Sequence, residues 1–202
     1  MKVNGHVACK TFPCGDIRRE SYYVPSVTLD PARISIILIS EAAPADLRDH
    51  YYAGRDPLFQ RTTVQAFQDA GTAVTSVRDI LDLGVYLTTA VKCGKSGYGI
   101  ETDTVRECSF LLEKEISLFT HNKAFLLMGD VAIKAVNSIA RRNGEPRVIP
   151  TGSTYRIRGQ PFFFRGKRVF PSYLQAGPGF FIEKSKRRMI AEDIAAALRL
   201  LE

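Results

Sequence analysis

Four cysteines are the residues of this chain best suited to a specific chemistry. Cys9 and Cys14 lie near the start as C-x4-C, and Cys93 and Cys108 follow much later with fourteen residues between them. Four thiolates can hold a structural zinc ion or an iron–sulfur cluster. The alternatives are two disulfides, or four thiols buried as small apolar groups. Two pairs that lie far apart in the sequence favour a single shared site.

The N-terminus and the cysteine spacing narrow these alternatives. Residues 1–14 lack the long apolar stretch of a secretory signal, so we expect a cytoplasmic protein whose thiols stay reduced. Zinc sites usually carry tight C-x2-C pairs in both halves, and neither pair here has that spacing. We therefore expect a 4Fe-4S cluster, with zinc as the alternative cofactor and unliganded thiols as the remaining possibility.

The length and the net charge of the chain indicate its domain organisation and the kind of partner that it binds. The 202 residues predict a single domain, residues 1–202, with an N-terminal cluster-binding segment. Lys and Arg number 28 against 21 Asp and Glu, a formal net charge of +7, which favours a polyanionic partner. We find no transmembrane segment and expect no membrane partner, and we expect a monomer.

Apolar runs and helical patterns alternate along the chain. Runs at residues 34–39, 85–91 and 124–128 are typical of strands covered on both faces. Helices are predicted at residues 63–70, 77–83, 102–119, 130–142 and 183–201, and short strand-like pieces at 155–158, 162–164 and 168–170. This alternation predicts a three-layer α/β/α sandwich around a mostly parallel sheet.

Polar side chains follow the predicted strands at the edge where such sheets bind ligands. Ser40 and Glu41 follow the first strand, Thr88, Thr89 and Lys92 the second, Gly129 and Asp130 the third, and Ser172 and Tyr173 the last. If these ends converge, the site combines one carboxylate with several hydroxyls, backbone donors and a basic rim.

The ordered motifs resemble those of the uracil-DNA glycosylase superfamily, most closely its iron–sulfur branches, families 4 and 5. The matching stretches are Cys9-x4-Cys14, Ser40-Glu41-Ala42-Ala43-Pro44, Thr88-Thr89-Ala90-Val91-Lys92-Cys93, the segment around Cys108, Met128-Gly129-Asp130-Val131-Ala132, and Phe170-Pro171-Ser172-Tyr173-Leu174. The resemblance spans nearly the whole chain and implies the glycosylase fold, a structural 4Fe-4S cluster and DNA, single- or double-stranded, as the partner.

This resemblance also implies roles for particular residues. Such enzymes extrude a nucleotide and hydrolyse its N-glycosidic bond through an oxocarbenium-like sugar and a departing base anion. Glu41 and Thr89 are the candidate catalytic residues. The base pocket is expected at Ser40, Ala42, Phe59 and Phe170, and DNA contacts are expected at Lys167, Arg168, Ser172, Tyr173, Leu174, Lys186 and Arg187. Tyr173 and Leu174 take the place of the family's apolar wedge.

Two departures bear on activity. Thr89 stands where the family has an asparagine, and Phe170 stands where the family has a histidine that stabilises the leaving base. We expect a DNA glycosylase for uracil or another deaminated or damaged base. The alternative is a catalytically inactive iron–sulfur DNA-binding module of the same fold, and a third possibility is an enzyme for free nucleotides.

Overall fold

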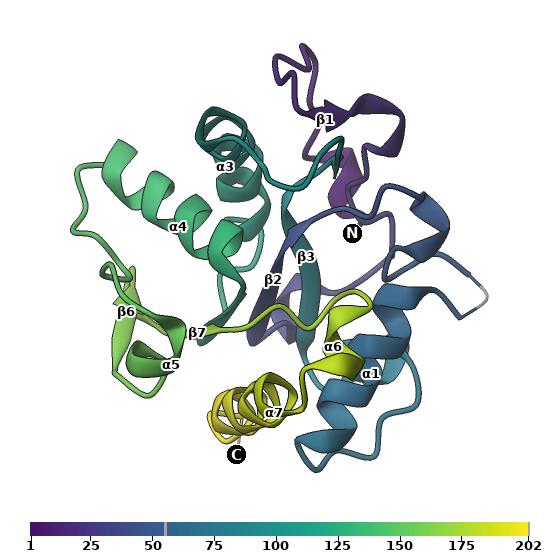
Figure 1. Ribbon diagram of the computed structural model, residues 1–202, viewed down its shortest axis with the longest axis vertical. Coiled ribbons are helices and arrows are strands. Elements are labelled where there is room, and N and C mark those ends of the chain that lie inside the picture. The colour runs from purple at the N-terminus through teal and green to yellow at the C-terminus, as the bar shows by residue number, and fades with distance from the viewer. Residues whose placement is uncertain (55, 202) are drawn as a thin grey trace.

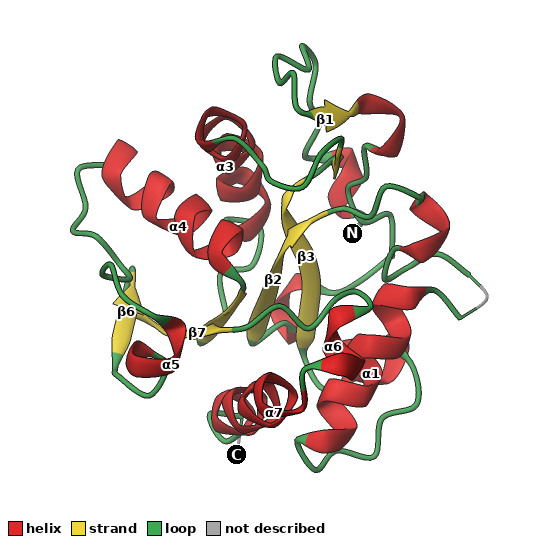
Figure 2. Cartoon of the chain, viewed as in Figure 1, coloured by secondary structure: helices red, strands yellow, loops and turns green. Residues whose placement is uncertain are grey.

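A five-stranded sheet lies between two layers of helices in the computed structural model, which describes residues 1–54 and 56–201 (Figures 1 and 2). Its strand order is β3-β2-β5-β7-β6, with β2 at Ile36–Ala42, β3 at Val85–Val91, β5 at Ala124–Met128, β6 at Phe162–Phe164 and β7 at Lys167–Ser172. The first four run parallel, and β6 pairs antiparallel with β7. The predicted three-layer sandwich is confirmed.

Helices cover both faces of this sheet. They are α1 at Leu58–Asp69, α2 at Val77–Asp82, α3 at Thr102–Ile116, α4 at Asp130–Arg142, α5 at Thr154–Ile157, α6 at Gly179–Ile182 and α7 at Lys184–Leu198. The helices α3 and α4 pack on one face, and α1 and α7 pack on the other (Figure 1). Because both faces are covered, every residue of β3 and β5 is buried. No described helix combines the length and apolarity needed to cross a membrane.

One predicted strand is wrong. Residues 155–158, expected to be extended, belong to the short helix α5 and the turn that closes it, in which the Ile157 and Arg158 N–H groups donate to the carbonyls of Ser153 and Thr154. The segment buries only Ile157, while Tyr155 is left 70 % exposed. A single apolar anchor suits one helical turn, since a strand here would need a pairing partner along its length.

A second, small sheet was not predicted. The strand β1 at Ile17–Arg18 pairs antiparallel with β4 at Gly94–Lys95. This pairing attaches the N-terminal segment to the loop that follows β3, near the top of Figure 1. Gly94 is needed at this junction because a Cβ there would lie 2.8 Å from the Cα of Ala45 and from the Oγ of Ser21. The loops that follow β2 and β3 therefore pack directly against each other.

The connections change direction in the middle of the sheet. After β2 the chain enters α1 on one face, whereas after the neighbouring strand β5 it enters α4 on the opposite face (Figure 1). In parallel α/β sheets, such a switch point opens a crevice at the carboxyl ends of the two strands, where ligands bind. Here that switch point lies between the residues that follow Ser40 in β2 and those that follow Met128 in β5.

Candidate functional site

Glu41 lies at this switch point. Its side chain extends from the end of β2 toward the first turn of α4, where Oε1 accepts a hydrogen bond from the Val131 N–H at 3.4 Å. Burial raises the pKa of the Glu41 carboxyl, and the nearby Asp130 charge adds to that rise, while the Val131 N–H and the Lys95 ammonium oppose it. The site therefore holds a half-buried carboxylate beside the positive end of a helix.

Gly129 makes room for this carboxylate. Its φ of +99° suits glycine, and a Cβ there would lie 2.5 Å from Oε1 of Glu41. The Gly129 N–H also donates to the Ser172 carbonyl at 3.0 Å, which ties the end of β5 to the end of β7. The motifs predicted around Glu41, Gly129 and Ser172 are thus brought to one edge of the sheet.

Ser40 and Thr89 face each other across β2 and β3 but are both about 1 % exposed. The hydroxyl of Ser40 contacts the Tyr51 hydroxyl and the side chain of Gln175. The Gln175 amide donates to Ser40 at 3.0 Å, to Tyr51 at 2.9 Å and to Thr63 at 3.3 Å. This buried network, made of Ser40, Tyr51, Thr63 and Gln175, holds one of the residues predicted to line the base pocket. Ala42, the next residue on this face of β2, is half-buried.

The two predicted pocket aromatics lie in different surroundings. The half-buried Phe59 ring packs with the rings of Tyr51 and His50, at centroid distances of 5.3 and 6.4 Å. Phe170 is buried in β7, with the Arg168 guanidinium 4.6 Å above its ring. Phe59 therefore borders the network around Ser40, whereas Phe170 is held within the sheet by an arginine.

Some of the predicted DNA contacts lie at the edge that carries Glu41. Ser172 ends β7 but is buried, and its hydroxyl donates to Asp193 of α7 at 2.5 Å. Leu174, beyond it, is 37 % exposed and borders a cavity of 200 Å³ that Lys186 and Arg187 also line. Tyr173 is half-buried beneath the Lys186 ammonium, 5.5 Å from the ring centroid.

Lys186 and Arg187, the two cations beside Leu174, both have acidic partners. Lys186 pairs with Glu183, which precedes the first turn of α7, and Arg187 donates to Asp69 of α1 at 2.8 Å. They still lie beside the exposed Leu174 tip, so the predicted combination of an apolar tip and flanking cations is present at this place.

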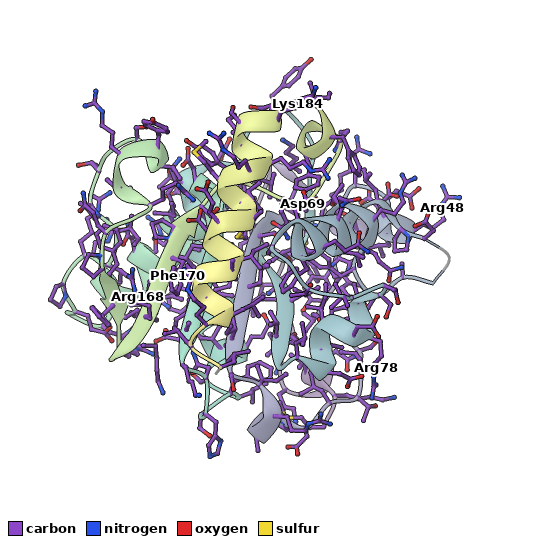
Figure 3. The ribbon with its side chains drawn as sticks, turned by 90° about the horizontal axis from the view of Figure 1, so that it is seen from below. Arg48, Asp69, Arg78, Arg168, Phe170 and Lys184 are labelled. Atoms are coloured by element: carbon purple, nitrogen blue, oxygen red, sulfur yellow. The ribbon has the colours of Figure 1, made fainter. Side chains whose placement is uncertain are left out.

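Lys167 and Arg168 lie elsewhere. They begin β7, so they occupy the amino edge of the sheet, Lys167 about 16 Å and Arg168 about 13 Å from Ser172 at roughly 3.3 Å per residue. The Arg168 guanidinium donates to the carbonyls of Phe162 and Val169 at 3.1 and 2.9 Å, which holds the β6–β7 hairpin together. Figure 3 shows Arg168 next to Phe170, with Lys184 at the distant end of α7. The structure does not bring these two cations to the Glu41 edge.

The four cysteines approach one another where the N-terminal segment meets α3. Burial, together with the negative charges of Cys108, Cys9 and Cys14 as thiolates, raises the pKa of Cys93 to about 12. Burial likewise raises the pKa of Cys108 to about 11. Cys9, Cys14 and Cys108 line one cavity of 360 Å³. Within residues 1–54 and 56–201, however, no group of three or more Cys, His, Asp or Glu side chains is drawn close enough to hold one metal ion.

Sequence reasoning missed two features of the site. Tyr51 and Gln175 join the network around Ser40 from loops 11 and 135 residues away in sequence, and no local pattern marks either of them. Lys92, expected on a basic rim, is fully buried and pairs with the fully buried Glu115 of α3. The sequence gives one indication of this pair. Glu115 lies on the apolar stripe of α3, and a buried glutamate needs a cationic partner.

Comparisons with known proteins show to which family the chain belongs. A search of curated proteins finds no match to the chain. The family model described as the uracil DNA glycosylase superfamily matches residues 27–187, which include β2, β3, β5, β7 and the switch point with Glu41. The match covers most of the chain, and the observed sheet and its carboxyl edge agree with it. The chain is a DNA glycosylase-like protein and belongs to the uracil-DNA glycosylase superfamily.

Proposed function

We propose that this protein hydrolyses the N-glycosidic bond of uracil or another deaminated or damaged base in DNA. The observation that carries the proposal is the half-buried Glu41 carboxylate at the switch point, held against Gly129 and the start of α4. In the reaction the bond between the sugar C1′ and the base nitrogen breaks, and the oxygen of a water molecule bonds to C1′. The Glu41 carboxylate offsets the positive charge of the sugar and accepts the proton of that water.

The departing base leaves as an anion that needs hydrogen-bond donors. Phe170 supplies none, and the hydroxyl of Ser40 already contacts Tyr51 and Gln175. We therefore assign this role to backbone N–H groups of the loops at the carboxyl edge, and we expect a base that needs few side-chain contacts.

Oligonucleotides that each carry one uracil, hypoxanthine or xanthine test this proposal. We expect the protein to release at least one of these bases, so that alkali then cleaves the strand at the abasic site. The same oligonucleotide with a normal base at that position is the control. Salt-dependent binding without cleavage of any substrate would contradict glycosylase activity.

Binding without cleavage would favour a DNA-binding module that has no catalytic activity. A specific observation supports this alternative, namely that the hydroxyls of Ser40 and Thr89 are buried and the former is held within a polar network. A module of this kind would keep the fold and the charged surface and would bind damaged or single-stranded DNA without breaking a bond.

We also propose that Cys9, Cys14, Cys93 and Cys108 hold a 4Fe-4S cluster. Cys9, Cys14 and Cys108 line one cavity where the N-terminal segment meets α3, and Cys93 follows β3. Neither cysteine pair has the C-x2-C spacing that is usual at zinc sites, which favours a cluster over zinc. The cluster would attach the N-terminal segment to α3 and to the end of β3, and it would take no part in bond cleavage.

Protein purified without air should therefore be brown, with about four irons per chain and visible absorbance that fades on reduction. A Cys93→Ser variant should lose the colour and most of the iron. A colourless wild-type protein that contains zinc would contradict the cluster and would leave the Glu41 mechanism untouched.

A further inference from the structure

Tyr98 is the most exposed of the large hydrophobic side chains. Its relative exposure is 103 %, and the flanking Gly97 and Gly99 have open space where a Cβ would be. A single exposed aromatic residue needs no explanation by itself. The position of Tyr98 does need one, because the loop of residues 96–101 follows β3 and β4 at the carboxyl edge, the edge that carries Glu41.

The start of this loop packs against the residues that follow Glu41. A Cβ on Gly94 would lie 2.8 Å from the Cα of Ala45 and 2.9 Å from the carbonyl oxygen of Pro44, and the charge of the next residue, Lys95, lowers the pKa of Glu41. The Lys95 ammonium in turn donates to the carbonyl of Tyr98 at 2.8 Å. Arg18, which is exposed, lies opposite Gly94 in the β1–β4 pair and adds a second cation to this corner.

The loop is held in place from both ends by one residue of the N-terminal segment. The Asp16 carbonyl accepts from the Ser96 N–H at 3.0 Å, and the Asp16 carboxylate accepts from the Glu101 N–H at 2.6 Å and from the Thr104 hydroxyl. Burial acts against the ionised carboxylate, but these hydrogen bonds outweigh it and lower the pKa of Asp16. The exposed ring is thus carried on a loop with fixed ends.

We propose that Tyr98 is a stacking platform for an unpaired nucleobase of DNA bound along the Glu41 edge. This inference rests on the proposed function and names a contact outside the motifs that carry the family resemblance. An exposed ring with cations beside it binds any base face, because each base offers a π surface and each phosphate a negative charge. The strand order places the β3 end and the β7 end, with its Leu174 tip, at about 14 Å from each other across the site.

A bound strand would then contact the protein on both sides of Glu41. Leu174 and its cations lie on the β7 side, and Tyr98 with Lys95 lies on the β3 side. Two contacts of this kind would hold the backbone on either side of one nucleotide, which is the nucleotide presented to the carboxylate.

Single-stranded oligonucleotides that contain the fluorescent base 2-aminopurine test the proposal. We expect Tyr98→Ala to weaken binding about tenfold and to reduce the fluorescence quenching that stacking on a ring produces. The salt dependence of binding should stay the same, because no phosphate contact is removed. Tyr98→Phe should bind like the wild type.

Tyr155→Ala is the matched control, since Tyr155 is also exposed but lies on α5, beside β6 in Figure 1. It should bind and quench as the wild type does. Equal affinity and equal quenching for Tyr98→Ala and the wild type would overturn the stacking role alone. Failure of the wild-type protein to bind any oligonucleotide would overturn the proposed function together with this inference.

Discussion

Replacement of Lys92 by methionine is expected to lower the free energy of unfolding by about 3 to 5 kcal/mol. Lys92 and Glu115 are both fully buried and form an ion pair. The Lys92 ammonium also donates to the Thr88 hydroxyl at 2.8 Å and to the Thr89 carbonyl at 2.5 Å. Methionine fills a similar volume but leaves the Glu115 carboxylate buried without its counter-charge, and this uncompensated charge is the source of the loss.

The double variant Lys92→Met with Glu115→Gln separates charge from packing. A glutamine can still accept the hydrogen bonds that Tyr86 and Thr88 donate to Glu115 at 2.7 Å. We therefore expect the double variant to recover most of the lost stability in urea denaturation under anaerobic conditions.

An exposed ion pair is the control for this experiment. Arg78 and Asp82 pair on the surface of α2, with side chains 68 % and 50 % exposed, and Arg78→Ala should change stability by less than about 0.5 kcal/mol. A Lys92→Met protein as stable as the wild type would show that Glu115 tolerates burial without its partner.

The position of Lys92 also shows where sequence reasoning ends. Strand β3 and helix α4 begin and end at the residues predicted for them, because a continuous apolar run and a glycine-bounded helical pattern are local signals. A lysine that follows a strand gives no local sign of whether its ammonium reaches water. Its burial depends on Glu115, which lies 23 residues further along the chain.

The same limit applies to the site. Glu41 could be placed at a strand end, and the order of strands and helices predicted that such ends would meet. The contact of Glu41 with Gly129, and the Gln175 amide between Ser40 and Tyr51, depend on long-range packing. In the same way, Lys167 lies at the amino edge of the sheet because β7 starts at this residue. The composition of the segment does not specify where that strand starts.

Replacement of Glu41 by glutamine is expected to lower the excision rate roughly 10² to 10⁴-fold, the usual contribution of a positioned acid or base. Glutamine keeps an oxygen that can accept from the Val131 N–H, so the start of α4 should be unchanged. The loss would therefore report the negative charge alone, measured as single-turnover release of the best base in the oligonucleotide series.

The stability of this variant should move in the opposite direction. Burial raises the pKa of Glu41, so the folded protein favours the neutral acid, and the wild type loses stability as the pH rises through that pKa. Glu41→Gln should accordingly melt at the same temperature as the wild type in acid and at an equal or higher temperature at neutral pH. A catalytic carboxylate in a buried site is expected to combine these two effects.

The pH dependence of excision supplies the last test. The rate should rise with pH as Glu41 ionises, with a midpoint above the ordinary pKa of a glutamate because burial raises it. Asp130→Asn is the matched control, since its charge contributes to that rise. This variant should stay active and shift the midpoint to lower pH. If Glu41→Gln retains full excision activity, Glu41 only caps α4, and the chemistry must be assigned to other groups at this edge.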